Sequence, residues 1–165
     1  MKLETVIKEL NLKPHPEGGY FYEYYRSTEK IRTDGLPDRY PGDRVFGTSI
    51  FYLLNAAEKS HFHRLKSDEI WYYHLGSTAV IHVIDPEKGY YPIELGPRLS
   101  EGEKLQYIIP AGCWFAAEVK HQTGFSLVGC AVFPGFDFAD FEMGNRDALL
   151  TEYPWLSEVI RKFCK

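Results

Sequence analysis

The chain has 165 residues, and its hydrophobic fraction of 44% and charged fraction of 25% are ordinary for a globular protein. This length predicts one domain over residues 1–165 and excludes a disordered chain or a small disulfide scaffold. The 19 Lys and Arg residues face 23 Asp and Glu residues, which gives a net charge of −4 without a basic run. We therefore expect no nucleic-acid partner, because phosphate binding needs clustered positive charge.

Neither the apolar stretches nor the cysteines indicate a membrane or an oxidising compartment. The longest apolar run, residues 127–133, is too short to span a bilayer, and the N-terminus lacks an apolar signal core. Cys113, Cys130 and Cys164 form no C-x-x-C pair, which is typical of reduced thiols. The sequence predicts a cytoplasmic protein with no membrane contact.

The order of the elements predicts an all-β fold. Apolar spacing over residues 3–10 indicates a short opening helix, and an aromatic strand over 20–27 precedes a polar loop over 27–43. Further short strands are expected at 44–55, 60–65, 69–75, 78–85, 90–95, 106–109, 114–119 and 125–133. Two small helices follow at 147–153 and 155–163, with Pro154 at the first turn of the second. Close turns without intervening helices favour an antiparallel sandwich or barrel.

The most informative segment runs from Ser60 to Gly76. His61 and His63 are two residues apart on a strand and therefore face the same side. Glu69 begins the next strand, so a hairpin can bring its carboxylate opposite the histidines, with Trp71 and Tyr73 on its own face. Such a cluster can bind a metal or move protons.

This segment resembles the first motif of the cupin superfamily. The motif is H-x-H, three or four residues, Glu, six residues and Gly, and the chain has His61-Phe62-His63, five residues, Glu69, six residues and Gly76. In the second motif, which ends in P-x-G-x-x-His, Phe115 stands in the place of the last metal-binding histidine.

More closely, the chain is similar to a small, largely uncharacterised cupin family over nearly its whole length. The markers of that family are H-P-E-G-G-Y, E-x-x-R-S, F-H-R, D-E-x-W and P-G-F-D-F-x-D-F, which here are residues 15–20, 23–27, 62–64, 68–71 and 134–141. The resemblance implies a jelly-roll barrel with an internal ligand cavity, often a homodimer, and no settled activity. In fold, the family is similar to the deoxythymidine-diphosphate-sugar epimerases, cupins with a histidine base and a tyrosine acid.

Several other residues are candidates for the pocket. The fork of the Arg26 guanidinium suits a carboxylate or phosphate, and Trp71 and Trp114 suit walls that stack a flat ring. Because Phe115 cannot coordinate a metal, we expect no tightly bound metal and no cofactor. With the cluster above, the predicted ligand-binding residues are Arg26, Ser49, His61, His63, Glu69, Trp71, Trp114, Phe115 and Asp140.

Four functions remain open, and the sequence does not decide whether the protein is an enzyme. The first is a small-molecule-binding cupin, for which a nucleotide or nucleotide sugar is the first ligand to test. The second is an epimerase or isomerase in which His63 is the base, Glu69 orients it and Tyr73 is the acid. The third is a metal-dependent enzyme that uses His61, His63 and Glu69, and the fourth is a storage or structural cupin.

Overall fold

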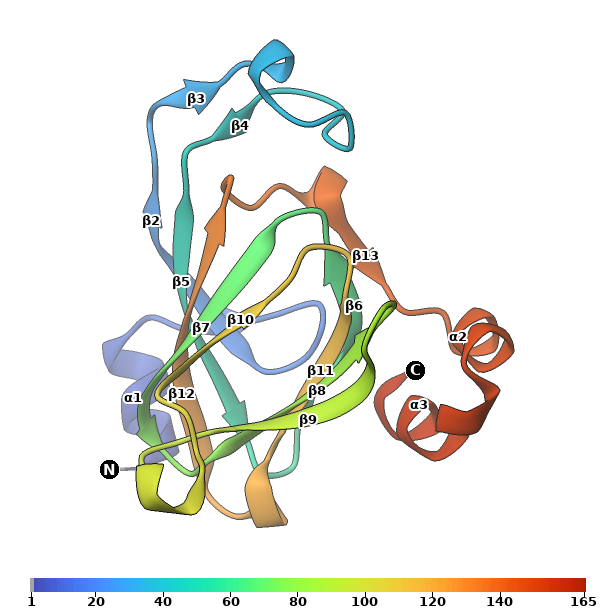
Figure 1. The fold of residues 1–165 in the computed structure, drawn as a ribbon. Coiled ribbons are helices and arrows are strands. Elements are labelled where there is room, and N and C mark those ends of the chain that lie inside the picture. Colours follow the sequence, from blue (N-terminus) through green and yellow to red (C-terminus); the bar gives the residue numbers. More distant parts are fainter. Residues whose placement is uncertain (1) are drawn as a thin grey trace.

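The computed structural model describes residues 2–165, and two antiparallel sheets form most of it (Figure 1). The six-stranded sheet has the order β1 (Lys13–Pro14), β2 (Tyr20–Arg26), β5 (Thr48–Asn55), β12 (Phe125–Phe133), β7 (Asp68–Gly76) and β10 (Gln106–Ile109). The five-stranded sheet has the order β13 (Phe141–Met143), β6 (Lys59–Leu65), β11 (Trp114–Val119), β8 (Ala79–Asp85) and β9 (Gly89–Leu95). The predicted jelly-roll class is confirmed, although the sheets do not close into a full barrel.

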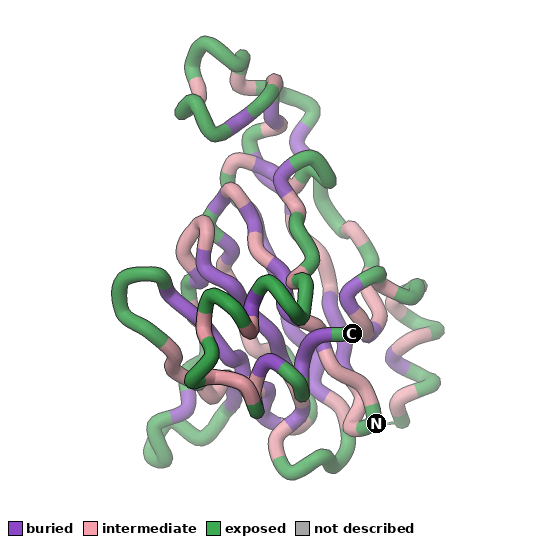
Figure 2. The backbone as a smooth tube through the Cα atoms, turned by 90° about the vertical axis from the view of Figure 1, so that its right-hand side faces the viewer, coloured by how far each residue is buried: buried purple, intermediate pink, exposed green. Residues whose placement is uncertain are grey.

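The main hydrophobic core lies between the two sheets. Tyr52 and Trp71 of the six-stranded sheet pack in one buried cluster with Ile81, Val83 and Phe115 of the five-stranded sheet. Inward residues alternate with outward ones along the strands, and central strands such as β12 and β8 are buried on both faces because helices cover the outer side of the sheets. Figure 2 shows the buried residues concentrated along these strands and the exposed ones at the loops.

Three helices cover the outer faces of the sheets. Helix α1 (Leu3–Glu9) buries Val6 against Leu53 and Leu127 of the six-stranded sheet, as the helical spacing predicts. Helices α2 (Arg146–Glu152) and α3 (Ser157–Phe163) pack at the other side of the molecule, where Leu149, Ile160 and Phe163 join Phe62 and Trp114 in a second buried cluster (Figure 1). None of the helices in residues 2–165 is both long and apolar enough to cross a membrane.

Short 3₁₀ helices occupy several connections between these elements. They are η1 (Thr33–Gly35), η2 (Leu99–Glu101), η3 (Lys120–Gln122), η4 (Phe138–Asp140) and η5 (Pro154–Leu156). Pro154 begins η5, so the first turn of the predicted second C-terminal helix is a separate 3₁₀ turn before α3. A proline fits there because the first turn needs no donor from its nitrogen.

The predicted strand over 44–55 is divided in two. Its first part, β4 (Arg44–Val45), pairs with β3 (Lys30–Ile31) in a hairpin that projects beyond the sheets (Figure 1), and β5 begins only at Thr48. The break lies at Gly47, where a Cβ atom would collide with the Phe133 ring. The predicted loop over 27–43 therefore also contains β3 and η1, which local composition did not indicate.

Candidate functional site

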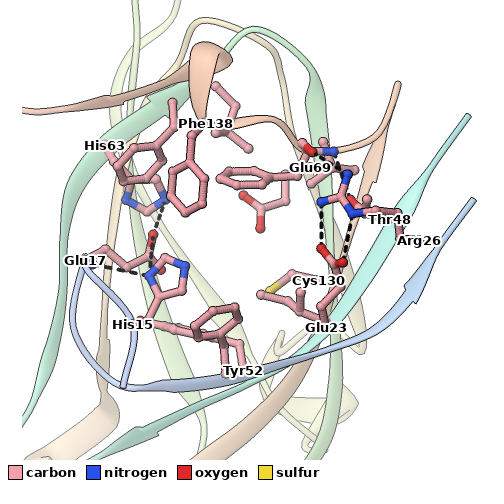
Figure 3. Close-up of a pocket in the computed structure, with 16 residues that line it drawn as sticks. His15, Glu17, Glu23, Arg26, Thr48, Tyr52, His63, Glu69, Cys130 and Phe138 are labelled. Carbon is pink, nitrogen blue, oxygen red and sulfur yellow. Dashed lines mark hydrogen bonds and ion pairs between the residues drawn. The ribbon is translucent and has the colours of Figure 1, made fainter. Parts of the chain in front are cut away.

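A cavity of about 90 Å³ opens between the two sheets at the end where segment 134–141 crosses over them. Aromatic and aliphatic side chains make up half of the residues that line it, and polar residues make up the other half (Figure 3). Those polar residues are His15, Glu17, Glu23, Arg26, Thr48, His63, Glu69 and Cys130.

An ion pair between His63 and Glu17 forms one side of the cavity. The Nε2 atom of His63 lies 2.9 Å from Oε2 of Glu17, and the two side chains are 3% and 8% exposed. The other ring nitrogen, Nδ1, lies 2.8 Å from the carbonyl oxygen of His61, which can only accept. Both ring nitrogens therefore donate, so His63 is held as an imidazolium cation beside the Glu17 carboxylate.

The pKa values of this pair follow from their contact. Burial works to lower the pKa of His63, but the charge and hydrogen bond of Glu17 outweigh burial and raise it. Burial works to raise the pKa of Glu17, and His63 outweighs that effect and leaves the pKa below its ordinary value. Ser60 Oγ donates a further hydrogen bond of 3.1 Å to Oε1 of Glu17.

A glycine turn carries Glu17 into the cavity. Gly18 has a φ of +112°, and a Cβ at this position would collide with the carbonyl oxygen of Lys59. Only glycine fits a backbone this close with this φ. The turn is fixed to β6 by the hydrogen bond of 2.8 Å from the His61 amide to the Glu17 carbonyl oxygen. The His15–Tyr20 motif thus has a structural reason, which is to place a carboxylate against His63.

Glu69 lies in the same cavity without such a partner. It is 7% exposed, its carboxyl group points into the cavity (Figure 3), and its Oε2 atom has no hydrogen-bond partner in the described part of the chain. Burial raises the pKa of this carboxyl to about 7, the positive charge of His63 opposes the rise, and the negative charge of Glu17 adds to it. A buried polar atom without a partner is costly. Oε2 is itself fully buried, and the side chains of Trp71 and Cys130 lie beside the carboxyl, so a ligand would reach Glu69 through the 7% of the residue that is exposed.

A second ion pair lies at the mouth, on the side of the cavity opposite His63 (Figure 3). Arg26 donates from Nε and Nη2 to the two carboxylate oxygens of Glu23 at 2.8 and 2.7 Å, and from Nη1 to the carbonyl oxygen of Phe136 at 3.1 Å. The fork of Arg26 is therefore already occupied on both sides. Its side chain is 42% exposed, so this pair faces solvent.

Three phenylalanines of segment 134–141 form an aromatic wall at the mouth. Phe136, Phe138 and Phe141 meet edge to face, with ring centroids 5.0 to 6.1 Å apart. The segment is anchored by a buried ion pair, in which Arg44 donates from Nε and Nη2 to Asp140 at 2.6 and 2.7 Å. The anchor positions the wall, because Asp140 directly precedes Phe141.

Comparison with known proteins identifies the family. A sequence profile described as cupin superfamily (DUF985) matches residues 4–144. The chain belongs to this cupin family. A solved hypothetical protein from Leishmania major is 38% identical, with a TM-score of 0.89 and 99% coverage of both chains. A protein of known structure from Shewanella oneidensis is 39% identical, with a TM-score of 0.89 and coverage of 100% of this cupin and 98% of that chain.

Two further proteins are less similar to the chain. An uncharacterised protein of Saccharomyces cerevisiae is 29% identical over 157 residues, covering 84% of this chain and 73% of the yeast protein. Oxalate decarboxylase from Bacillus subtilis is 14% identical, with a TM-score of 0.55, and the match covers 91% of this cupin and 36% of the decarboxylase. At that identity the likeness shows the fold alone.

The donor atoms of this cupin do not fit a metal. In residues 2–165, no three His, Cys, Asp or Glu side chains are arranged so that they could hold a metal ion. Both nitrogens of His63 are engaged by acceptors, and the ring of Phe115 packs 4.1 Å from the ring of His63 in the place of a fourth ligand. The site is therefore built from ion pairs and aromatic rings.

The structure brings three of the predicted site residues to the cavity, namely Arg26, His63 and Glu69. The carboxylate that contacts the His63 ring belongs to Glu17 and not to Glu69, the partner that the hairpin predicted. His61 does not line the cavity, because the pairing of β6 with β11 shifts by one residue between Ser60 and His63, and this bulge breaks the alternation that predicted a shared face for His61 and His63. The Nδ1 atom of His61 donates a hydrogen bond of 2.7 Å to the Glu17 carbonyl oxygen, so the glycine turn covers it.

Four predicted residues near the cavity have other contacts. Phe115 lies behind the His63 ring, and Trp71 packs edge to face against Tyr52 and Phe115 in the core. Tyr73 donates a hydrogen bond of 2.7 Å from its hydroxyl to the Gly76 carbonyl oxygen. Ser49 follows Thr48, which does line the cavity, so the alternation of the strand turns Ser49 to the opposite face.

Two more predicted residues lie outside the cavity. Trp114 belongs to the cluster beneath α2 and α3, and the guanidinium of Arg64 lies 4.4 Å from its ring centroid. Asp140 pairs with Arg44, so its role is to hold segment 134–141. The cavity is also lined by residues that the sequence did not indicate as site residues, and these are His15, Glu17, Phe21, Glu23, Thr48, Ile50, Tyr52, Leu65, Cys130, Val132, Phe136, Phe138 and Phe141. Of these, Glu17 had a signal, because it lies in a family motif whose glycines require a special turn.

Proposed function

We propose that this cupin binds a small organic molecule in the cavity and that Glu69 transfers a proton to or from it. The observation that supports the proposal is the Glu69 carboxyl, which is buried in the cavity, has an oxygen without a partner in the described part of the chain and has a pKa of about 7. A general acid or base acts best when its pKa lies near the working pH. A perturbed carboxyl in a cavity is therefore a candidate for proton transfer.

The neighbouring groups support this role for Glu69 over one for His63. A general base needs a free lone pair, and both His63 nitrogens are engaged as donors. The His63–Glu17 pair instead supplies a fixed, nearly neutral side of the cavity. An isomerase-type reaction fits best, because Glu69 can take a proton from one position of the ligand and return it to another. Such a reaction needs no metal and no second reactant.

The finer expectation of a nucleotide or nucleotide sugar rested on an aromatic slot together with Arg26, which would bind the phosphate. Its fork is occupied by Glu23 and by the Phe136 carbonyl oxygen, so an anionic ligand would have to displace a carboxylate. Ligand pockets usually have volumes of roughly 300–1,000 Å³, and the present cavity has about 90 Å³. Only one end of a nucleotide would enter it.

Hydrogen exchange from solvent tests the proposal for any substrate that loses a proton from carbon. The protein is incubated in D₂O with sugars, hydroxy acids, keto acids, amino acids and nucleotide sugars, and deuterium on carbon is measured by mass spectrometry. We expect exchange in at least one compound, with a loss of about 100-fold or more in Glu69→Gln.

The matched control is Glu94→Gln, which removes a carboxylate paired with Lys120 outside the cavity. This variant should exchange at the wild-type rate. Exchange by Glu69→Gln at the wild-type rate would refute the role of Glu69, and ligand binding without any exchange would leave a binding protein.

A further inference from the structure

The charges in the cavity favour one class of ligand. Each cation that lines it already contacts a carboxylate, since His63 pairs with Glu17 and Arg26 pairs with Glu23. Burial lowers the pKa of His15, which keeps this imidazole neutral. An anion entering the cavity would find no free positive partner among the lining residues that the structure describes.

Glu69 is the group with free capacity. Its Oε2 atom is buried and without a partner among residues 2–165, and the other charged groups facing it are already bound to each other. The charged groups are His63 from β6 and Glu17 from the glycine turn, and two uncharged groups, the thiol of Cys130 from β12 and the indole of Trp71 from β7, also lie beside the carboxyl. A buried carboxylate is stabilised most by a cation that forms a hydrogen bond with it.

The aromatic wall has the same preference. Phe136, Phe138 and Phe141 meet edge to face, and Phe138 is 63% exposed at the mouth although it is apolar. Rings exposed at the mouth offer apolar surface that the carbon part of a ligand would cover, and their faces carry partial negative charge that repels an anionic ligand head. A ligand that is cationic at one end and apolar at the other would satisfy both the wall and Glu69.

We propose that the ligand of this cavity is a small organic ammonium ion whose nitrogen contacts the Glu69 carboxylate and whose apolar part packs against Phe136, Phe138 and Phe141. This inference rests on the proposed function and names the chemical class of its ligand. With a volume of about 90 Å³, the cavity accepts the ammonium group and a few carbons. The rest of the ligand lies at the mouth, against Phe138.

Three probes of similar shape and different charge test the inference. Benzylammonium, benzyl alcohol and benzoate each join a ring to a polar head, and their binding is measured by NMR titration at pH 8. We expect benzylammonium to bind at least about tenfold more tightly than the other two, because only its head is a cation. Glu69→Gln should lose about tenfold or more in affinity for benzylammonium. Glu94→Gln should retain the wild-type affinity.

The pH dependence of benzylammonium affinity in the wild-type protein is a second test, and it needs no variant. An ammonium ion binds the ionised form of Glu69, so its affinity should rise by about tenfold between pH 6 and pH 8 as that carboxyl loses its proton. An anionic ligand would bind the protonated form better, and its affinity would fall over the same range, whereas a neutral alcohol can bond with either form and should change less. Benzylammonium keeps its charge throughout.

The outcomes separate this inference from the proposed function. If benzoate or benzyl alcohol binds more tightly and Glu69→Gln abolishes that binding, the ligand class is wrong and the role of Glu69 stands. If benzylammonium does not bind, or binds equally to Glu69→Gln, the inference is overturned. The hydrogen-exchange experiment then decides independently whether Glu69 transfers protons.

Discussion

The two sides of the cavity each carry a buried glutamate, and the two glutamates differ in their contacts and in the direction of their pKa shifts. On the side of β6 and the glycine turn, Glu17 has His63 at 2.9 Å and Ser60 at 3.1 Å, and its pKa is lowered. On the side of β7 and β12, Glu69 has an oxygen without a partner in residues 2–165 and a pKa of about 7. The two residues are 6% and 7% exposed, so burial does not separate them. The partner decides whether a buried carboxylate is a structural group or one that remains available to a ligand.

The largest effect is expected from a variant that breaks the ion pair between His63 and Glu17. Glu17→Gln leaves the His63 cation buried without a counter-charge, and we expect a loss of about 3 kcal/mol in the free energy of unfolding at pH 7. Urea denaturation measures it. As pH falls from the ordinary pKa of a glutamate toward the lowered pKa of folded Glu17, the difference from wild type should shrink, because the unfolded wild-type chain takes up a proton that the folded state does not. A loss under about 0.5 kcal/mol would show that the pair is not structural.

Whereas Glu17→Gln should lower the free energy of unfolding, Glu69→Gln should raise it relative to wild type at high pH. Because the pKa of Glu69 is raised on folding, the folded state holds a proton that the unfolded state releases, and stability falls as pH rises from about 4.5 to about 7. Glu69→Gln removes this dependence. Its free energy of unfolding relative to wild type should therefore increase by about 2 kcal/mol between pH 5 and pH 8. Thermal and urea unfolding at both pH values check it, and a flat difference would contradict the raised pKa.

The ion pair at the mouth is exposed, so it should contribute less to stability than the buried pair of His63 and Glu17. Arg26→Lys loses the two-pronged contact with Glu23, but the side chain is 42% exposed and solvent screens the pair. We expect a change under about 1 kcal/mol in the free energy of unfolding. Calorimetry on the same variant tests the anion role predicted for Arg26. Weaker binding of a nucleotide with an unchanged melting temperature would support that role against the ammonium inference.

The smallest effect is expected from the removal of metal ions with a chelator. Protein purified without added metal should hold well under one equivalent of zinc, manganese, iron, nickel or copper by elemental analysis. A chelator should leave the melting temperature unchanged, because His63 is already engaged through both nitrogens. A stoichiometric metal that survives dialysis and disappears in His63→Ala would reverse this conclusion.

Local pattern was sufficient for the elements and for part of the site. Alternating aromatic residues, glycine turns and the helical spacing of Leu3 and Val6 predicted the strands and α1, because each element buries one face with its own period. The same alternation placed His63 and Glu69 on inward faces of β6 and β7, but it also placed His61 there, which was wrong because spacing alone does not reveal the bulge in β6. These predictions needed only the spacing of residues within one strand or hairpin.

The pairing of the charges was decided by the tertiary structure. Glu17 meets His63 because the glycine turn docks on β6, and Asp140 meets Arg44 although 96 positions separate them in the chain. Thr48 lines the cavity in place of Ser49 because the pairing of β5 in the six-stranded sheet sets which of its faces points inward. Periodicity shows that a strand has two faces, whereas only packing selects the residues from distant segments that satisfy a buried charge. That Glu69 has no ion-pair partner as close as the one Glu17 has is therefore a property of the fold, and no short segment of the sequence shows it.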